Sequence, residues 1–260
     1  MNAPSEKLIP VRERIKSVND LLEKYKPQIS AALPRHLTID RILRVAMSSI
    51  QKNQKLLECT QSSLISAIIQ SSQLGLELDG VLGQAYIVPF KNNKKGVIEC
   101  QFIPGYLGLM LLARNSGTVL SISAHAVYPG DEFQYELGLF PKLVHIPREV
   151  DEDPKDLNYV YAVAKIKDSD PQFKVMSRYK IDNIRRRSKS SDDGPWATDY
   201  EQMALKTVVK QLCKFLPQSP ELATAIEIDN QAEIEEISSQ IIEIESEPET
   251  PKTSHLDEGT

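Results

Sequence analysis

The chain has 260 residues, 41% of them hydrophobic, so it is long enough to bury one large core or two smaller ones. No apolar run reaches the roughly 18 residues that a membrane-spanning helix needs. Residues 1–10 also lack the apolar stretch of a signal peptide. We therefore expect a cytoplasmic protein with no membrane partner. The cysteines, Cys59, Cys100 and Cys213, lack CxxC spacing, which disfavours disulfide and zinc sites and favours buried, reduced thiols.

Charge is distributed unevenly along the chain. The formal net charge is -5, yet residues 218–260 hold 12 acidic residues and one basic residue, Lys252. Residues 1–217 hold the other 30 lysines and arginines against 24 acidic residues. This asymmetry predicts a basic body that binds a polyanion, followed by an acidic, flexible tail. If the tail competes with the polyanion, deleting the residues after 217 should tighten binding.

Residues 1–58 have the pattern of a helical region. Val11, Ile15, Val18 and Leu22 recur at helical spacing, and Pro27 is expected to end that segment. A second helix is expected to begin near residue 38. We expect this region to pack against the rest of the chain or to mediate oligomerisation.

The next segment combines a helix with a β-hairpin. Thr60 is a suitable N-cap for a helix over 61–74, and Gly75 is a suitable residue to follow its end. Two β-rich runs, 85–90 and 97–103, flank a turn with a basic tip. The candidate DNA-binding residues at this tip are Lys91, Lys94 and Lys95. Lysine at a hairpin end also discourages edge-to-edge aggregation, so both interpretations stay open here.

A mixed α+β pattern continues toward the C-terminus. A short apolar helix over 105–114 ends at Arg114 and contains Tyr106, and both residues are candidate DNA contacts. Strand-like runs separated by turns then follow, at 119–128, 132–137, 143–146, 159–166 and 173–176. These runs predict an α+β body that extends over residues 59–217 and precedes the tail at 218–260.

Basic residues gather again before the tail. The candidate cluster is Arg178, Lys180, Arg185, Arg186, Arg187 and Lys189. A helix expected over 199–216 places Lys206, Lys210 and Lys214 on one side and apolar residues on the other. Such a lysine stripe is often only a solvated face. Because the arginine cluster precedes it, we interpret the two together as a phosphate-binding surface.

Aromatic side chains near basic residues are candidates for stacking on unpaired bases. They are Phe90, Tyr106, Tyr179 and Trp196. Each could equally be a core residue. We favour Trp196, because it follows a loop and precedes the lysine stripe.

Motifs of catalysis are absent from the sequence. It contains no Gly-x4-Gly-Lys-Ser/Thr loop, no GxGxxG after a strand, no HExxH and no Gly-x-Ser-x-Gly. Helix-turn-helix and zinc-finger patterns are also absent. We therefore predict a polyanion-binding protein without a catalytic site. Two alternatives stay open: a metal-dependent nuclease, which would need converging carboxylates, and an adaptor that binds acidic protein.

The ordered set of short motifs resembles the RecT family of phage-type single-strand annealing recombinases. The motifs are LPRHLT (33–38), SSQLGLE (71–77), GQAYIVPF (83–90), FIPGYLGL (102–109), GDEF (130–133), HIP (145–147), VYAVA (160–164), GPW (194–196) and MALKT (203–207). They cover about residues 30–217. One departure is Leu107, because members of the family often have a basic residue inside the Gly-Tyr-x-Gly motif.

The resemblance implies a fold, an activity and partners. It implies a small antiparallel-rich β-sheet with a projecting hairpin, backed by helices. It implies ATP-independent binding of single-stranded DNA and annealing of complementary strands in recombination and repair, through an annealed duplex intermediate. The implied partners are other copies, in a ring or helical filament, a 5′-to-3′ exonuclease and the host single-strand-binding protein. No cofactor is implied, and the question whether magnesium changes the DNA-binding mode stays open.

Overall fold

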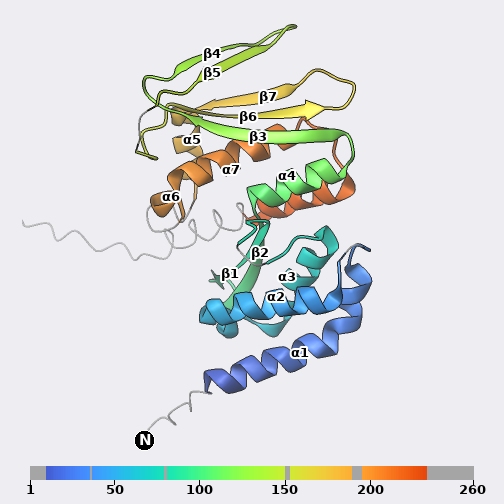
Figure 1. The fold of residues 1–260 in the computed structure, drawn as a ribbon. Coiled ribbons are helices and arrows are strands. Elements are labelled where there is room, and N and C mark those ends of the chain that lie inside the picture. The colour runs from blue at the N-terminus through green and yellow to red at the C-terminus, as the bar shows by residue number, and fades with distance from the viewer. Residues whose placement is uncertain (1–9, 36, 79–80, 150–152, 189–194, 233–260) are drawn as a thin grey trace, which may run out of the picture.

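The computed structural model describes residues 10–35, 37–78, 81–149, 153–188 and 195–232. Helices and antiparallel strands are mixed along the chain, which confirms the α+β prediction. In Figure 1, the lower part contains the N-terminal helices and a first hairpin. The upper part contains the central sheet, a second hairpin and the remaining helices. No helix within the described ranges is long and apolar enough to cross a membrane.

The N-terminal region consists of three helices and a short 3-10 turn. They are α1 (Val11–Ala32), α2 (Ile39–Lys52), η1 (Gln54–Glu58) and α3 (Gln61–Leu74). The prediction that Pro27 ends the first helix is wrong, because Pro27 lies inside α1. Ile29 lies in the following turn and is fully buried. Its packing offsets the backbone hydrogen bond that proline cannot donate.

Helix α3 and the first hairpin follow their sequence signals closely. Thr60 caps α3 by accepting a hydrogen bond from the Ser63 backbone N–H, and Gly75 ends it with a φ of 65°. Strands β1 (Ala85–Asn92) and β2 (Val97–Pro104) pair antiparallel, with Ile87 opposite Phe102. The backbone N–H of Thr60 donates to the Ile98 carbonyl at 2.9 Å, which joins the start of α3 to β2.

The central sheet has three antiparallel strands in the order β3-β6-β7. They are β3 (Val119–Val127), β6 (Tyr159–Ile166) and β7 (Gln172–Ser177). Val160, Ala162 and Ala164 are fully buried on the face of β6 that meets the helices. Figure 1 shows α4 (Tyr106–Asn115) and α7 (Tyr200–Cys213) beneath this face.

A second hairpin lies over the opposite face of the sheet (Figure 1). It consists of β4 (Glu132–Glu136) and β5 (Lys142–Ile146). Phe133 stacks on Tyr161 with ring centroids 5.6 Å apart. The two ring nitrogens of His145 lie 3.1 Å from the Tyr161 hydroxyl and 3.1 Å from Asp131 Oδ2. The structure therefore contains two hairpins outside the central sheet, where we expected one.

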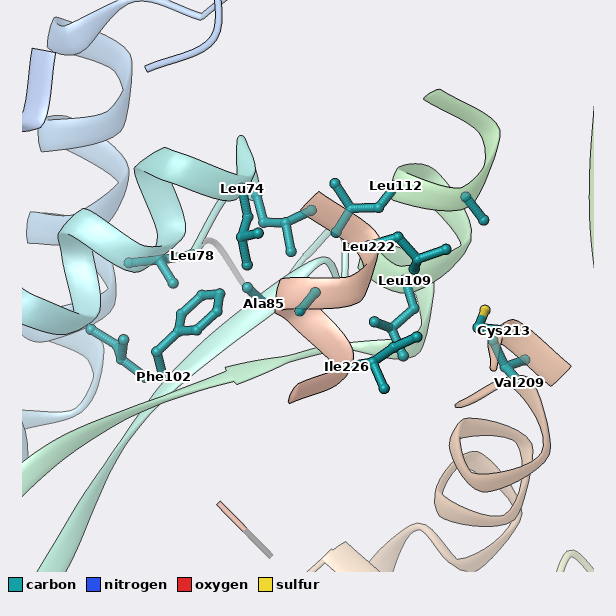
Figure 2. Packing of buried hydrophobic residues seen from close by; sticks show 14 of the residues in the cluster. Leu74, Leu78, Ala85, Phe102, Leu109, Leu112, Val209, Cys213, Leu222 and Ile226 are labelled. Atoms are coloured by element: carbon teal, nitrogen blue, oxygen red, sulfur yellow. The ribbon is translucent and has the colours of Figure 1, made fainter. Parts of the chain in front are cut away.

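The folded body extends past the charge boundary at Pro217. Residues 220–232 form a helix, in which Leu222 and Ala225 are fully buried. Figure 2 shows Leu222 and Ile226 near Leu109 and Leu112 of α4, within the same buried cluster. The charge pattern predicts a flexible tail from residue 218 onward, and this prediction is wrong for residues 220–232. The apolar face of this helix instead makes it part of the core. The remainder of the predicted tail, residues 233–260, lies outside the described residues.

Candidate nucleic-acid interface

The predicted basic cluster contains a short helix, α5 (Arg178–Arg185), which the sequence analysis did not predict. Ile181 is fully buried and fixes the inner side of this helix. Five exposed residues lie along a solvent-facing arc of α5 and of the turn that follows it, and we call them the α5 surface. They are Arg178, Tyr179, Lys180, Arg186 and Arg187. Lys189, the last residue of the predicted cluster, lies outside the described residues.

Tyr179 is the aromatic residue of the α5 surface. It is 71% exposed and lies near the centre of the arc, between Arg178 and Lys180 in the chain. A ring surrounded by cations can stack on a base while the cations pair with phosphates.

The contacts of the α5 arginines leave most of their positive charge available to bind phosphate. Arg178 lies 3.9 Å from Asp156 and 3.8 Å from Asp182, which are loose ion pairs in solvent. Arg186 donates to the Asn183 side chain at 2.6 Å, so its charge is not neutralised by that contact. Arg185 differs, because its guanidinium lies 5.8 Å from the Tyr200 ring centroid. Arg185 thus helps to hold α5 against α7.

Trp196, which we predicted to be a stacking platform, is buried in the structure. Trp196 lies in α6 (Pro195–Thr198), is only 4% exposed, and packs on Tyr200 with centroids 6.0 Å apart. Among the exposed aromatics that the sequence analysis did not single out, Phe140 is 81% exposed and Phe215 is 65% exposed. Lys174 lies 5.1 Å from the ring centroid of Phe215, and Lys214 beside it is exposed. Phe215 follows the end of α7 at Cys213 and turns outward.

The lysine stripe on α7 is not the exposed face that helical spacing predicted. Lys210 is 4% exposed, and its Nζ lies 2.6 Å from Asp229 Oδ2. The Nζ of Lys206 lies 2.9 Å from Asp229 Oδ1, and its side chain is 19% exposed. Burial alone would raise the pKa of Asp229, but the two ammonium groups outweigh burial and lower it. Helix 220–232 therefore covers two of the three lysines.

The hairpin lysines lie apart from α5. Lys91, Lys94 and Lys95 are exposed, and Lys95 pairs with Glu99 at 2.8 Å. The hydrogen bonds from Lys95 and Asn92 lower the pKa of Glu99. Hairpin β1–β2 lies in the lower part of Figure 1, whereas α5 lies beside the central sheet. The structure thus does not bring these predicted residues into one patch.

The Gly-Tyr-x-Gly motif at the start of α4 has a structural role in this chain. A Cβ on Gly105 or Gly108 would collide with the backbone carbonyl of Gly83 or Gln84, respectively. Tyr106 is half-buried, and its hydroxyl donates to Gln202 of α7 at 3.1 Å. Burial raises the pKa of Tyr106. The two glycines therefore let α4 approach the chain before β1, and Tyr106, a predicted DNA contact, joins α4 to α7. Arg114 is exposed at the end of α4.

No group of three or more histidine, cysteine, aspartate or glutamate residues that could hold a metal ion occurs in the described part of the chain. The basic α5 surface and its exposed ring define the class of protein. This is an α+β protein with a basic helix and an exposed aromatic side chain, an arrangement suited to a flexible polyanion with planar groups.

Comparison with known proteins identifies the family. The model of the RecT family matches residues 40–243. Protein RecT of Escherichia coli strain K12 is 47% identical over 206 residues, which cover 78% of this chain and 76% of that protein. The uncharacterized protein YqaK of Bacillus subtilis strain 168 is 24% identical over 257 residues, which cover 94% of this chain and 81% of that protein. The chain belongs to the RecT family, and family membership supports a role in recombination by single-strand annealing.

Proposed function

We propose that this protein binds single-stranded DNA on the α5 surface and anneals complementary strands without nucleotide hydrolysis. The observation that carries the proposal is the exposed Tyr179 among Arg178, Lys180 and Arg186, in a chain of the RecT family. Cations that neutralise phosphates release condensed counterions, which favours binding of any sequence. Stacking of one base on Tyr179 would contribute about 1–3 kcal/mol.

Annealing of this kind needs no free energy from nucleotide hydrolysis. Each base-pair step formed releases about 1.4 kcal/mol on average, so pairing itself drives the reaction. The protein would hold one strand extended by its phosphates and leave the base edges free for a second strand. The lack of a Gly-x4-Gly-Lys-Ser/Thr loop agrees with a mechanism that uses no ATP. The proposal includes no cofactor and no catalytic residue.

The proposal also includes assembly of several copies of the protein and a source of single-stranded DNA. A single α5 surface is short, so an extended strand would need several copies side by side, as a ring or filament. A 5′-to-3′ exonuclease would expose the strand, and the host single-strand-binding protein would be displaced from it. These events would take place in the cytoplasm.

The test is annealing of two complementary, fluorophore-labelled oligonucleotides by the purified full chain with no nucleotide present. We expect annealing well above the protein-free rate, with the acceleration fading as salt rises, because phosphate contacts are lost in salt. A magnesium titration in the same assay tests whether magnesium changes the binding mode. Tight binding of single strands without faster annealing would refute the annealing activity and favour a coating or adaptor role.

A further inference from the structure

Two lysine ammonium groups converge on one buried carboxylate between α7 and helix 220–232. Asp229 has 2% of its side chain exposed, and its two oxygens lie 2.9 Å from Lys206 Nζ and 2.6 Å from Lys210 Nζ. Two ammonium groups thus share one carboxylate, and Lys210 has almost no contact with solvent.

Such a cluster is a costly way to join two helices. Burying charged groups costs desolvation free energy, which only close contacts between the charges offset. Apolar side chains of similar size in the same place usually stabilise a protein equally well or better. Leu222, Ala225 and Ile226 already anchor helix 220–232 by apolar burial. The charged cluster is thus not needed to explain why this helix packs on the body.

The geometry of the cluster matches that of an anion site. A phosphodiester, like a carboxylate, offers two oxygens that share one negative charge. Each oxygen of Asp229 meets a different ammonium group, so the carboxylate stands where a phosphate could bind. Lysine is a common phosphate ligand, acting as a point charge. Lys206 and Lys210 are one helical turn apart on α7, so they present their charges on the same side.

We propose that Lys206 and Lys210 form a binding site for a backbone phosphate of single-stranded DNA, and that Asp229 occupies this site in the free protein. Helix 220–232 would then compete with DNA and would leave α7 when a strand binds. This inference rests on the proposed DNA-binding function. It assigns the competition to one carboxylate at the end of the folded body, and not to the net charge of the tail.

The first experiment compares Asp229→Asn with a matched control, Glu227→Gln, both in the full chain. Each variant removes one negative charge from the same helix, but Glu227 is exposed and pairs with neither lysine in the described contacts. The probe is a fluorescent oligothymidine, and the readout is the dissociation constant over a range of salt. We expect Asp229→Asn to bind about tenfold more tightly, because the competent state is more populated. Glu227→Gln should bind like the wild type.

A third variant checks which groups receive the phosphate. Adding Lys206→Ala and Lys210→Ala to Asp229→Asn should cancel the gain and reduce the salt slope by about 0.7, the value for one lost phosphate contact. Equal affinity of Asp229→Asn and the wild type overturns the inference, as does an equal gain in Glu227→Gln. A wild type that binds no single-stranded DNA overturns the proposed function itself.

A second measurement needs no variant and holds even if Asp229→Asn folds poorly. Amide hydrogen exchange of the wild-type chain is followed with and without the oligonucleotide. We expect the amides of 220–232 to lose protection when DNA binds, because the helix leaves α7. Unchanged or increased protection of these amides in the DNA-bound protein overturns the inference.

Discussion

Replacing Arg186 and Arg187 with alanine should weaken binding of single-stranded DNA through the loss of two phosphate contacts. Both side chains are exposed at the end of α5, and Arg186 lies on the same side of the helix as Tyr179. Neither carries an ion pair to a carboxylate among the described contacts. Their charge is therefore available to a phosphate.

The size of the effect follows from counterion release. Each phosphate contact contributes about 0.7 to the slope of log affinity against log salt for a single strand. Two lost contacts should lower this slope by about 1.4. Over a tenfold range of salt, the affinity of the variant should then change about 25-fold less than that of the wild type.

The assay is fluorescence anisotropy of a labelled oligonucleotide at five or more salt concentrations, with a matched pair of substitutions as control. Lys16→Ala with Lys24→Ala removes the same charge from exposed positions on α1, far from α5 in Figure 1. We expect this control to keep the wild-type slope. If both double variants lower the slope equally, net charge and not the α5 surface determines binding, and the reasoning is refuted.

Three further predictions concern the body of the protein. Trp196, the single tryptophan, is 4% exposed, so an added oligonucleotide should leave its fluorescence unquenched; strong quenching would show that bases reach it. Gly108→Ala should destabilise the fold by about 3 kcal/mol in chemical denaturation, because the clash with the Gln84 carbonyl outweighs the about 1 kcal/mol gain in helix propensity; an unchanged midpoint would contradict the role assigned to this glycine. Burial alone would raise the pKa of Asp131, but hydrogen bonds from the Arg148 and Tyr128 N–H groups and from His145 lower it. A carboxylate with a lowered pKa in the folded state stabilises the protein above its unfolded pKa, and this contribution is lost as the pH falls below about 4. Asp131→Asn should therefore lower the melting temperature at pH 7 and flatten its decline toward pH 3, and parallel curves would refute this.

Local sequence determined several elements because their signals need no distant partner. Thr60 and Gly75 define the two ends of α3, and the strand expected over 159–166 coincides with β6. Antiparallel pairing of β1 and β2 followed from two β-rich runs around a short turn. Helix caps, glycines in the left-handed conformation and hairpin turns depend on only a few neighbouring residues, so they can be predicted from local sequence.

Whether a given side chain is buried or exposed depended on which other elements pack against it. Pro27 stays helical because Ile29 is buried against other elements. Trp196 became a core residue, although its place after a loop is equally typical of a surface residue. Tyr179 is exposed beside the cations of α5, and the helical spacing of Lys206 and Lys210 does not indicate that another helix covers them.

The sequence by itself determined the α+β class, the family and the presence of a basic body, because motifs, periodicity and charge counts are properties of the chain. Tertiary structure decided which cations face solvent. Lys210 and Arg186 are both cations in the body, yet Lys210 contacts a buried aspartate and Arg186 is exposed to solvent. The difference arises because the apolar face of residues 220–232 must be buried, and burying it on α4 and α7 carries Asp229 to the two lysines.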